Sequence, residues 1–302
     1  MKKFVLQVFV FLILGFIIGE SIIRVFKLYI DVPTMYVDKN GLIKAHPNQE
    51  GHTVWGHKWC INRFGEYGYE PQRLDSIFTV IGDSYIANTI NPVACHQARL
   101  LALNFDSVDF YPSARGGAGF IEFIVIANSL YHLKPTQHLL YVHDSDFIES
   151  IIELENNRNK LQWSYKTKQI RKPYFSESKY ELRRLLYTGK FAYYIYRNYL
   201  LKADNKNTDN ANVVFNETKY TKINGLLDYI NLNYITENIT IIFSPNSDKR
   251  LISLVSRYNY KTIELKTNDY KAWQFDNDAH WNCYGHEQVA SQVSEHIKQM
   301  HF

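Results

Sequence analysis

The 302-residue sequence contains few cysteines, and its three cysteines lie far apart. Cys60, Cys95 and Cys283 form no C-x-x-C pair. This spacing argues against a zinc site and against a disulfide-rich scaffold. One disulfide would be compatible with an oxidising compartment, but the sequence does not indicate which two cysteines would pair.

The sequence also lacks a large block of basic residues. The net charge is only +4, and the basic clusters are short, such as Arg171-Lys172 and Arg183-Arg184. A nucleic acid is therefore not an expected partner. The glycines at 116, 117 and 119 show neither the G-x-G-x-x-G nor the Walker spacing, so no nucleotide cofactor is expected.

Long apolar runs are absent after residue 28, which leaves one candidate membrane segment. Phe4 to Gly19 is broken only by Gln7, and apolar residues continue past Glu20 to Leu28. Sixteen helical residues reach only ~24 Å, less than the ~30 Å hydrocarbon core, so this extension matters. A cleaved signal peptide and an uncleaved anchor are both compatible with the pattern. The missing Ala-x-Ala site favours an anchor over residues 1–30.

The charges around this segment predict its orientation. Lys2 and Lys3 precede the apolar run and favour a cytoplasmic N-terminus, although Arg24 and Lys27 weaken the bias. We therefore expect a single-pass protein whose remaining chain lies outside the cytoplasm, in a bacterial periplasm or at the cell surface.

From about residue 76 the sequence alternates between expected strands and helices. An apolar run over 77–82 ends in Gly82-Asp83-Ser84, and a second run over 108–111 leads into a glycine-rich stretch at 113–119. A third run, 138–142, ends at His143-Asp144-Ser145-Asp146. Such alternation predicts a parallel sheet covered by helices on both faces. Because sites collect at the carboxyl ends of parallel strands, we expect these three segments to lie together.

The rest of the chain divides around this pattern. Residues 31–75 are expected to form a connecting region of short strands or loops, and residues 76–302 the main domain. Residues 149–215 interrupt the alternation, and the spacing of apolar residues over 177–201 favours a helical insertion, either a lid over the cleft or a packing helix. The alternation resumes with helices expected at 220–235, 249–257 and 284–299, and strands at 239–243 and 262–265.

Two short motifs suggest nucleophilic chemistry. A buried strand that ends at Ser84 would expose a serine at the carboxyl edge of the sheet. Asp278 and His280, expected in a loop before the last helix, are one residue apart. The carboxylate can therefore turn back to accept the imidazole Nδ1–H and leave Nε2 as a base. Asp276 is a less favoured alternative for the carboxylate. Asp144 and Asp146 lack further ligands at suitable spacing and are expected to cap a loop rather than to hold a metal.

These motifs together resemble the SGNH (GDSL-type) hydrolase superfamily. The resemblance rests on Gly82-Asp-Ser-Tyr85, Arg115-Gly-Gly-Ala-Gly119 and Asp278-Ala-His-Trp-Asn282, and it covers about 77–146 and 237–300. The Asp-x-His-Trp motif is similar to that of the branch of this superfamily related to alginate O-acetyltransferases. The N-terminal segment and Ile61-Asn-Arg-Phe-Gly65 resemble membrane-anchored bacterial members. The resemblance implies a flavodoxin-like three-layer α/β/α fold and acyl-ester chemistry at a serine.

The resemblance also implies roles for individual residues. Ser84 would be the nucleophile and an oxyanion donor, His280 the general base and acid, and Asp278 its orienting carboxylate. Gly117 is the best match to the oxyanion glycine, with Gly116 as the alternative. The family's third donor is an asparagine, and Ser145 stands at its position, so either Ser145 or another residue such as Asn88 would have to donate.

The expected function is therefore that of a membrane-anchored serine esterase or acyltransferase. Its expected substrate is an O-acyl, chiefly O-acetyl, group on a cell-envelope glycan, with a membrane acyltransferase as a candidate partner. The 23 tyrosines and 18 phenylalanines would suit a sugar-binding cleft as well as an ordinary core. Two alternatives are a non-catalytic glycan-binding or assembly protein and a lipid-directed esterase or thioesterase.

Overall fold

The computed structural model describes residues 1–53, 58–174, 185–196, 198, 215–258, 260–276 and 278–299. Its centre is a five-stranded parallel sheet in the order β11-β10-β7-β5-β6. Numbered along the chain within this sheet, the order is 2-1-3-4-5, which is the flavodoxin-like doubly wound arrangement. The strands are β5 (Ile77–Gly82), β6 (Asp109–Ala114), β7 (Gln137–Val142), β10 (Ile239–Phe243) and β11 (Lys261–Glu264).

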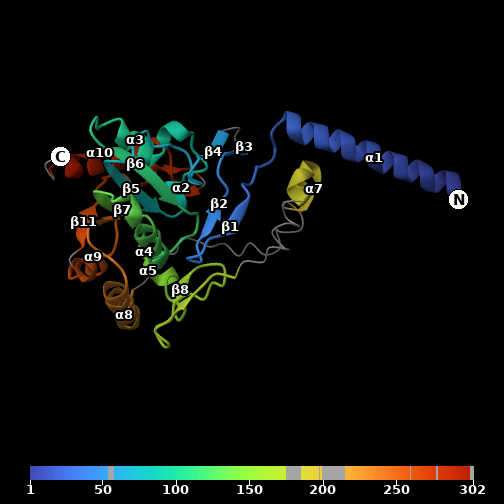
Figure 1. Cartoon of the computed structure of the whole chain (residues 1–302). Coiled ribbons are helices and arrows are strands. Elements are labelled where there is room, and N and C mark those ends of the chain that lie inside the picture. The colour runs from blue at the N-terminus through green and yellow to red at the C-terminus, as the bar shows by residue number, and fades with distance from the viewer. Residues whose placement is uncertain are drawn as a thin grey trace.

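Helices cover both faces of this sheet and make a three-layer α/β/α fold (Figure 1). Four of the strands are buried at every residue, as expected where helices pack on both faces. One face carries α4 (Phe120–Ser129), α8 (Glu217–Asn233) and α9 (Lys249–Ser256). The other carries α3 (Gln97–Ala102) and α10 (Cys283–Gln299). The predicted fold class is confirmed.

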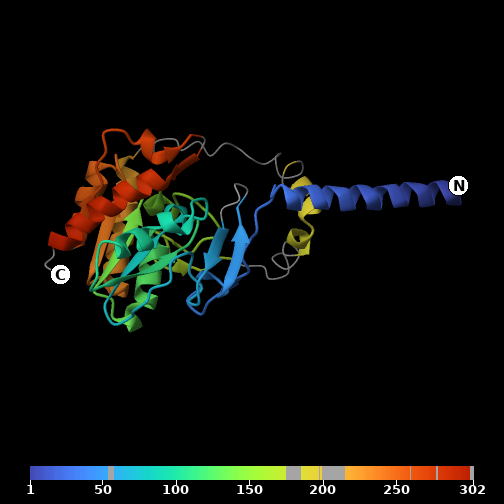
Figure 2. The same ribbon diagram turned by 90° about the horizontal axis from the view of Figure 1, so that it is seen from above.

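Two antiparallel hairpins occupy the region that was expected to connect the apolar segment to the sheet. They are β1 (Met35–Val37) with β2 (Ile43–Ala45), and β3 (Gln49–His52) with β4 (Lys58–Ile61). Trp59 and Ile61 form a small core with Ala45. Figures 1 and 2 show these hairpins between the central sheet and α1.

Glu66 joins this region to the sheet and carries a pH-dependent part of the stability. Its carboxylate is 7% exposed and accepts a hydrogen bond of 3.0 Å from the Ser113 hydroxyl on β6. Burial raises the pKa of Glu66 to about 7, although Lys44 and Ser113 lower it. A carboxyl whose pKa is raised on folding stabilises the fold below its ordinary pKa, and this contribution is lost as the pH rises towards 7.

Replacing Glu66 with glutamine should therefore make the protein more resistant to unfolding at pH 8. A shift from 4.5 to about 7 corresponds to ~3 kcal/mol as an upper figure. Urea unfolding of the wild type and of Glu66→Gln at pH 4.5, 6 and 8 measures the difference, with the exposed Glu50→Gln as control. A difference between the two proteins that does not change with pH would contradict this assignment.

A long apolar helix, α1 (Lys2–Val25), starts the chain and extends away from the rest of the molecule (Figures 1 and 2). An 18-residue window of this helix has a mean hydropathy of 2.3, and the 24 residues span ~36 Å, enough to cross a bilayer. A signal sequence would have the same length and composition. The helix continues through Glu20, whose carboxylate accepts the backbone N–H groups of Lys190 and Phe191 at the start of α7 (Lys190–Ile195).

Three of the predicted local structures need correction. The segment expected to be a helical insertion, 149–215, instead begins with a hairpin of β8 (Gln162–Trp163) and β9 (Ile170–Arg171) that buries Trp163 in the core. Within the expected helix 177–201, the structure describes only residues 185–196 and 198, with α7 over six of them, and the polar stretch 202–212 lies outside the described residues. The apolar residues near 92–104 predict a helix after the first strand of the sheet, but this segment is interrupted at His96, where extended backbone separates a 3₁₀ turn (Val93–Cys95) from α3.

The third correction concerns the Asp-x-His motif. It lies in a strand rather than in a loop: β13 (Asp278–Trp281) pairs with β12 (Gln274–Phe275) immediately before α10. Other helices within the described residues are α2 (Ser84–Ala87), α5 (Asp144–Glu149) and the 3₁₀ turns Tyr131–Leu133 and Lys271–Trp273.

Candidate functional site

Ser84 is the first residue of α2, at the carboxyl end of strand β5. Gly82 makes the sharp strand-to-helix turn possible, because a Cβ atom there would lie 2.5 Å from Cγ1 of Ile86. Asp83 caps the helix by accepting the Tyr85 N–H at 2.9 Å. The turn therefore fixes Ser84 at the edge of the sheet.

His280 and Asp278 meet Ser84 from the other end of the chain. The Ser84 hydroxyl lies 2.8 Å from Nε2 of His280, and Asp278 accepts the Nδ1–H of the same ring. Asp278 also accepts the His280 backbone N–H at 2.9 Å, so the carboxylate turns back onto its own strand as the spacing predicts. Burial on its own would raise the pKa of Asp278. The hydrogen bonds from the His280 backbone and ring, and the charge of that ring, lower it by more, so the pKa of Asp278 lies below its usual value. Asp276 does not take this position.

Tyr85 connects the serine to the strand that carries the histidine. Its hydroxyl donates to the Ala279 carbonyl at 2.9 Å, between Asp278 and His280. Its ring lies 4.7 Å from that of His280 and 4.0 Å from that of His143. In the sequence Tyr85 stands out only as part of a motif, and this contact could not be predicted because Ala279 lies 194 residues away.

The glycine-rich loop after β6 lies beside Ser84. A Cβ atom on Gly116 would be 3.8 Å from that of Ser84, and Gly117 has a φ of +72°, which favours glycine. The N–H groups of Arg115, Ala118 and Gly119 donate within the structure. Among the described residues, those of Gly116 and Gly117 donate to no protein acceptor. Both are therefore free to bind an anionic oxygen, and Gly116 makes the closer approach to Ser84.

Ser145 and Asn88 differ in their availability as a third donor. Ser145 is half-buried in the first turn of α5, after the strand adjacent to β5, and its hydroxyl bonds to none of the described residues. Asn88 is buried, and its amide donates to the Cys95 carbonyl while its oxygen accepts from Asn91. Asn88 thus holds a turn, and Ser145 is the better placed of the two.

Lys160 reaches the same loop from the segment 149–215. A Cβ atom on Gly117 would lie 3.9 Å from Cε of Lys160, and the ammonium group forms an ion pair with Glu149. Burial raises the pKa of Asp83 to about 6, and the charge of Lys160 acts against that rise. The same cation opposes the raised pKa of Asp146. Lys160 thus adds a positive charge near the carboxylates around Ser84, and no sequence motif indicated it.

His143, Asp144 and Asp146, which follow β7, have structural roles. Asp146 accepts the His143 N–H at 2.7 Å and Asp144 accepts the Asp248 N–H at 2.9 Å, as expected for capping residues. Burial, together with the nearby His280, lowers the pKa of His143 to about 4. His143 is thus neutral at pH 7 and packs as a ring against Tyr85 and Trp281.

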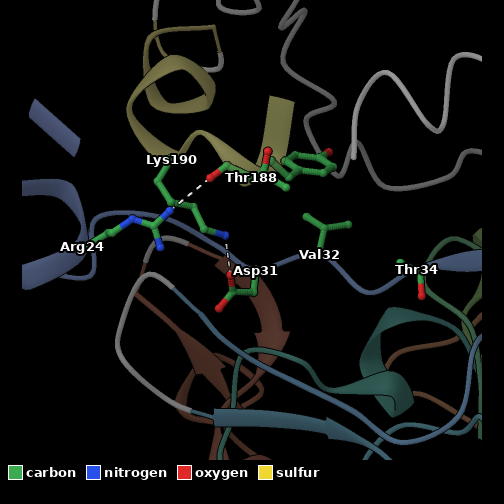
Figure 3. A pocket seen from close by; sticks show the side chains of 7 residues that line it. Arg24, Asp31, Val32, Thr34, Thr188 and Lys190 are labelled. Atoms are coloured by element: carbon green, nitrogen blue, oxygen red, sulfur yellow. Dashed lines mark hydrogen bonds and ion pairs between the residues drawn. The ribbon is translucent and has the colours of Figure 1, made fainter. Parts of the chain in front are cut away.

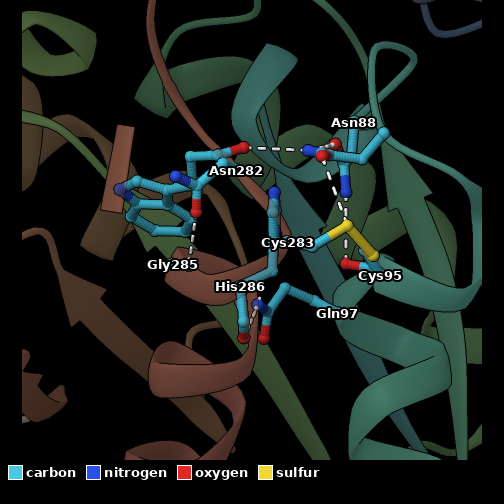
Figure 4. The surroundings of a disulfide bond; sticks show 9 residues. Asn88, Cys95, Gln97, Asn282, Cys283, Gly285 and His286 are labelled. Carbon is cyan, nitrogen blue, oxygen red and sulfur yellow. Dashed lines mark hydrogen bonds between the residues drawn. A yellow bond between two sulfur atoms is a disulfide. The ribbon is translucent and has the colours of Figure 1, made fainter. Parts of the chain in front are cut away.

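A disulfide fixes the helix that follows the histidine strand. Cys95 bonds to Cys283 at the start of α10, and Cys60 remains a thiol. Figure 4 shows Gln97 beside His286, whose carbonyl accepts from the Gln97 amide at 2.7 Å. Burial lowers the pKa of His286 to about 3, so this histidine is a neutral packing group. The pairing that the sequence left open thus ties β13 and α10 to the turn before α3.

No family model and no curated protein matches this sequence. Among solved structures, a family two carbohydrate esterase from Clostridium thermocellum, in complex with cellohexaose, is similar at 12% identity and a TM-score of 0.40 over 78% of this chain and 68% of that one. A G-D-S-L family lipolytic protein from Veillonella parvula is similar at 11% identity and a TM-score of 0.38 over 74% of this chain and 99% of that one. A putative GDSL-like lipase from Bacteroides ovatus is similar at 14% identity and a TM-score of 0.38 over 76% of this chain and 100% of that one. These similarities are remote, and the fold described above rests on the sheet order itself.

Proposed function

We propose that this protein is a serine esterase or acyltransferase of the SGNH type, acting through an acyl-enzyme on Ser84. The observation that carries the proposal is the row of contacts from Ser84 Oγ to His280 Nε2, at 2.8 Å, and from His280 Nδ1 to Asp278. A serine, a correctly oriented imidazole and a carboxylate in this order are the parts that acyl transfer to a hydroxyl nucleophile requires.

The reaction follows from this geometry. His280 takes the Ser84 proton as Oγ attacks the ester carbonyl, and the oxyanion forms beside the N–H groups of Gly116 and Gly117. His280 then protonates the departing alcohol, which leaves an acyl group on Ser84. Water or a second alcohol, deprotonated by His280, attacks this acyl group and regenerates the serine. Hydrolysis and transfer therefore use the same residues.

The natural substrate that we propose is an O-acetyl group on a cell-envelope glycan outside the cytoplasm. The support is the apolar helix α1, whose length suits an anchor, and the disulfide, which persists in oxidising compartments. The test uses full-length protein in detergent with p-nitrophenyl acetate, a fluorophosphonate probe and an O-acetylated oligosaccharide. Turnover and labelling of one serine are expected; the absence of both from folded protein would overturn the proposal.

Tyr85→Phe should lower the turnover number about 5- to 10-fold. The substitution removes one hydrogen bond, worth ~1 kcal/mol, that holds the Ala279 carbonyl and thereby the His280 strand. Because the ring stays in place, the KM for p-nitrophenyl acetate should change little. Tyr284→Phe, on an exposed tyrosine of α10, is the control. Equal turnover numbers for Tyr85→Phe and Tyr284→Phe would show that the Tyr85 hydroxyl does not position the strand that carries His280.

Lys160→Gln should reduce the turnover number more strongly, by about 10- to 100-fold, which corresponds to a lost charge-assisted contact of ~1.5–3 kcal/mol. Without Lys160, Glu149 and Asp83 leave uncompensated negative charge beside the oxyanion. Lys160→Arg should restore most of the rate, because it keeps the charge. Glu149→Gln breaks the same ion pair but keeps the positive charge of Lys160. It should therefore retain the activity that Lys160→Gln loses.

A further inference from the structure

Two adjoining cavities lie between Asp278 and the end of α1. One, of about 500 Å³, is lined by Asp278 and by mostly apolar side chains: Ile30, Val32, Pro33, Trp59, Tyr67 and Ile90. The other, of about 390 Å³, is lined by Arg24, Thr34, Thr188 and Lys190 (Figure 3). Asp31 and Val32 line both cavities, so the two lie next to each other.

The second cavity lies at the last turn of the apolar helix. Arg24 donates to the Thr188 carbonyl at 3.0 Å, and Lys190 forms an ion pair with Asp31. Phe191 packs against Phe16, with ring centroids 5.6 Å apart. If α1 spans a bilayer, charged and aromatic side chains here stand at the level of lipid head groups, where such residues are favoured.

The first cavity adjoins the catalytic row at Asp278, on the far side of the His280 imidazole from Ser84. Ser84, His280, the oxyanion glycines and Lys160 line neither cavity. A group in this cavity therefore lies beyond the reacting ester, on the side of the histidine that protonates the departing alcohol. The cavity is thus available to a part of the alcohol that is remote from the ester bond.

Figures 1 and 2 show that the carboxyl end of the sheet, with α2, faces the side from which α1 departs. Residues 30–33, which line the apolar cavity, follow α1 after a few residues. The candidate site is therefore directed towards the membrane end of the molecule rather than away from it.

We propose that the alcohol part of the substrate is the head group of a glycolipid in the same membrane, bound through these two cavities. This inference rests on the proposed esterase or acyltransferase function and narrows its substrate class. The apolar walls beside Asp278 would receive the sugar and the first carbons of its lipid, while the polar cavity at α1 would lie at the bilayer surface. A soluble glycan would make no use of this second cavity.

The test compares one acylated sugar in two forms, using full-length protein reconstituted in phosphatidylcholine vesicles. The substrates are an O-acetylated hexadecyl glucoside in those vesicles and the matching O-acetylated methyl glucoside in solution. The lipid form should be deacetylated with a kcat/KM at least 10-fold higher, at equal bulk concentration. Val32→Trp, at the junction of the cavities, should remove most of this preference. The preference is measured as the ratio of kcat/KM on the two glucosides, so that a general loss of activity in this variant does not count as a loss of preference.

Leu232→Trp, on an exposed side chain of α8, is the control and should keep the preference. Similar rates of the wild type on both glucosides would overturn the glycolipid proposal while leaving the esterase intact. Failure on p-nitrophenyl acetate as well would instead count against the proposed function. As a readout without turnover, a diazirine beside the sugar of the lipid should crosslink Ser84→Ala protein at residues 30–33 or 89–90. Crosslinks confined to other segments would also overturn the proposal.

Discussion

Ser84→Ala is expected to lower the turnover of p-nitrophenyl acetate by about 10⁴-fold or more and to abolish fluorophosphonate labelling. The nucleophile is the one group in the site that no neighbour can replace. The Ser84 hydroxyl is the only serine oxygen among the described residues that bonds to His280 Nε2. Without it, the imidazole has no alcohol to deprotonate, and only a weak contribution from the oxyanion donors and substrate binding would remain.

The structure predicts that this loss is chemical rather than structural. Ser84 is half-buried, its Oγ has no other partner among the described residues, and the turn is held by Asp83 and Gly82. The thermal midpoint of Ser84→Ala should therefore equal that of the wild type. Ser256→Ala, which removes an exposed hydroxyl on α9, should retain both activity and labelling. Labelling that persists in Ser84→Ala would place the nucleophile elsewhere and contradict the proposed mechanism.

The parts of this site that were predictable from sequence are those that lie at element ends. Strands 77–82 and 137–142 are marked by apolar runs, and in a parallel sheet their carboxyl ends must share one edge. That rule places Ser84 and Ser145 at the same edge without any knowledge of contacts. The Asp-x-His spacing likewise predicts that Asp278 can reach Nδ1, because it is a local property of the backbone.

Contacts between distant segments could not be predicted in this way. Lys160 comes from a stretch with no recognisable pattern, and its place beside Gly117 depends on how the β8–β9 hairpin packs against α4 and α8. The Tyr85 bond to Ala279 depends on the β12–β13 pairing, which two-residue β12 does not reveal by alternation. The partner of Cys95 was equally undetermined, since any pairing of three cysteines fits the sequence.

Removing the disulfide should have the second large effect, and it should act mainly on stability. The bond joins residues 188 positions apart, and chain-entropy considerations give ~5 kcal/mol for so long a loop, with ~2–5 kcal/mol typical of native disulfides. Cys95→Ser with Cys283→Ser should lower the free energy of unfolding by an amount in this range. Cys60→Ser, which removes the remaining thiol, should have a much smaller effect.

The position of the bond also predicts how activity responds. Cys283 follows β13 closely, but the Trp281 carbonyl is held independently by the Asn91 amide at 2.8 Å. The double variant should therefore retain much of its esterase rate at low temperature and lose it at a lower temperature than the wild type. Dithiothreitol should shift the wild-type midpoint towards that of the variant and leave the variant unchanged. Because thiols stay reduced in the cytosol, protein produced there without residues 1–30 should behave like the variant until it is oxidised. Unfolding curves that coincide for wild type and double variant would show that the bond contributes nothing to the fold.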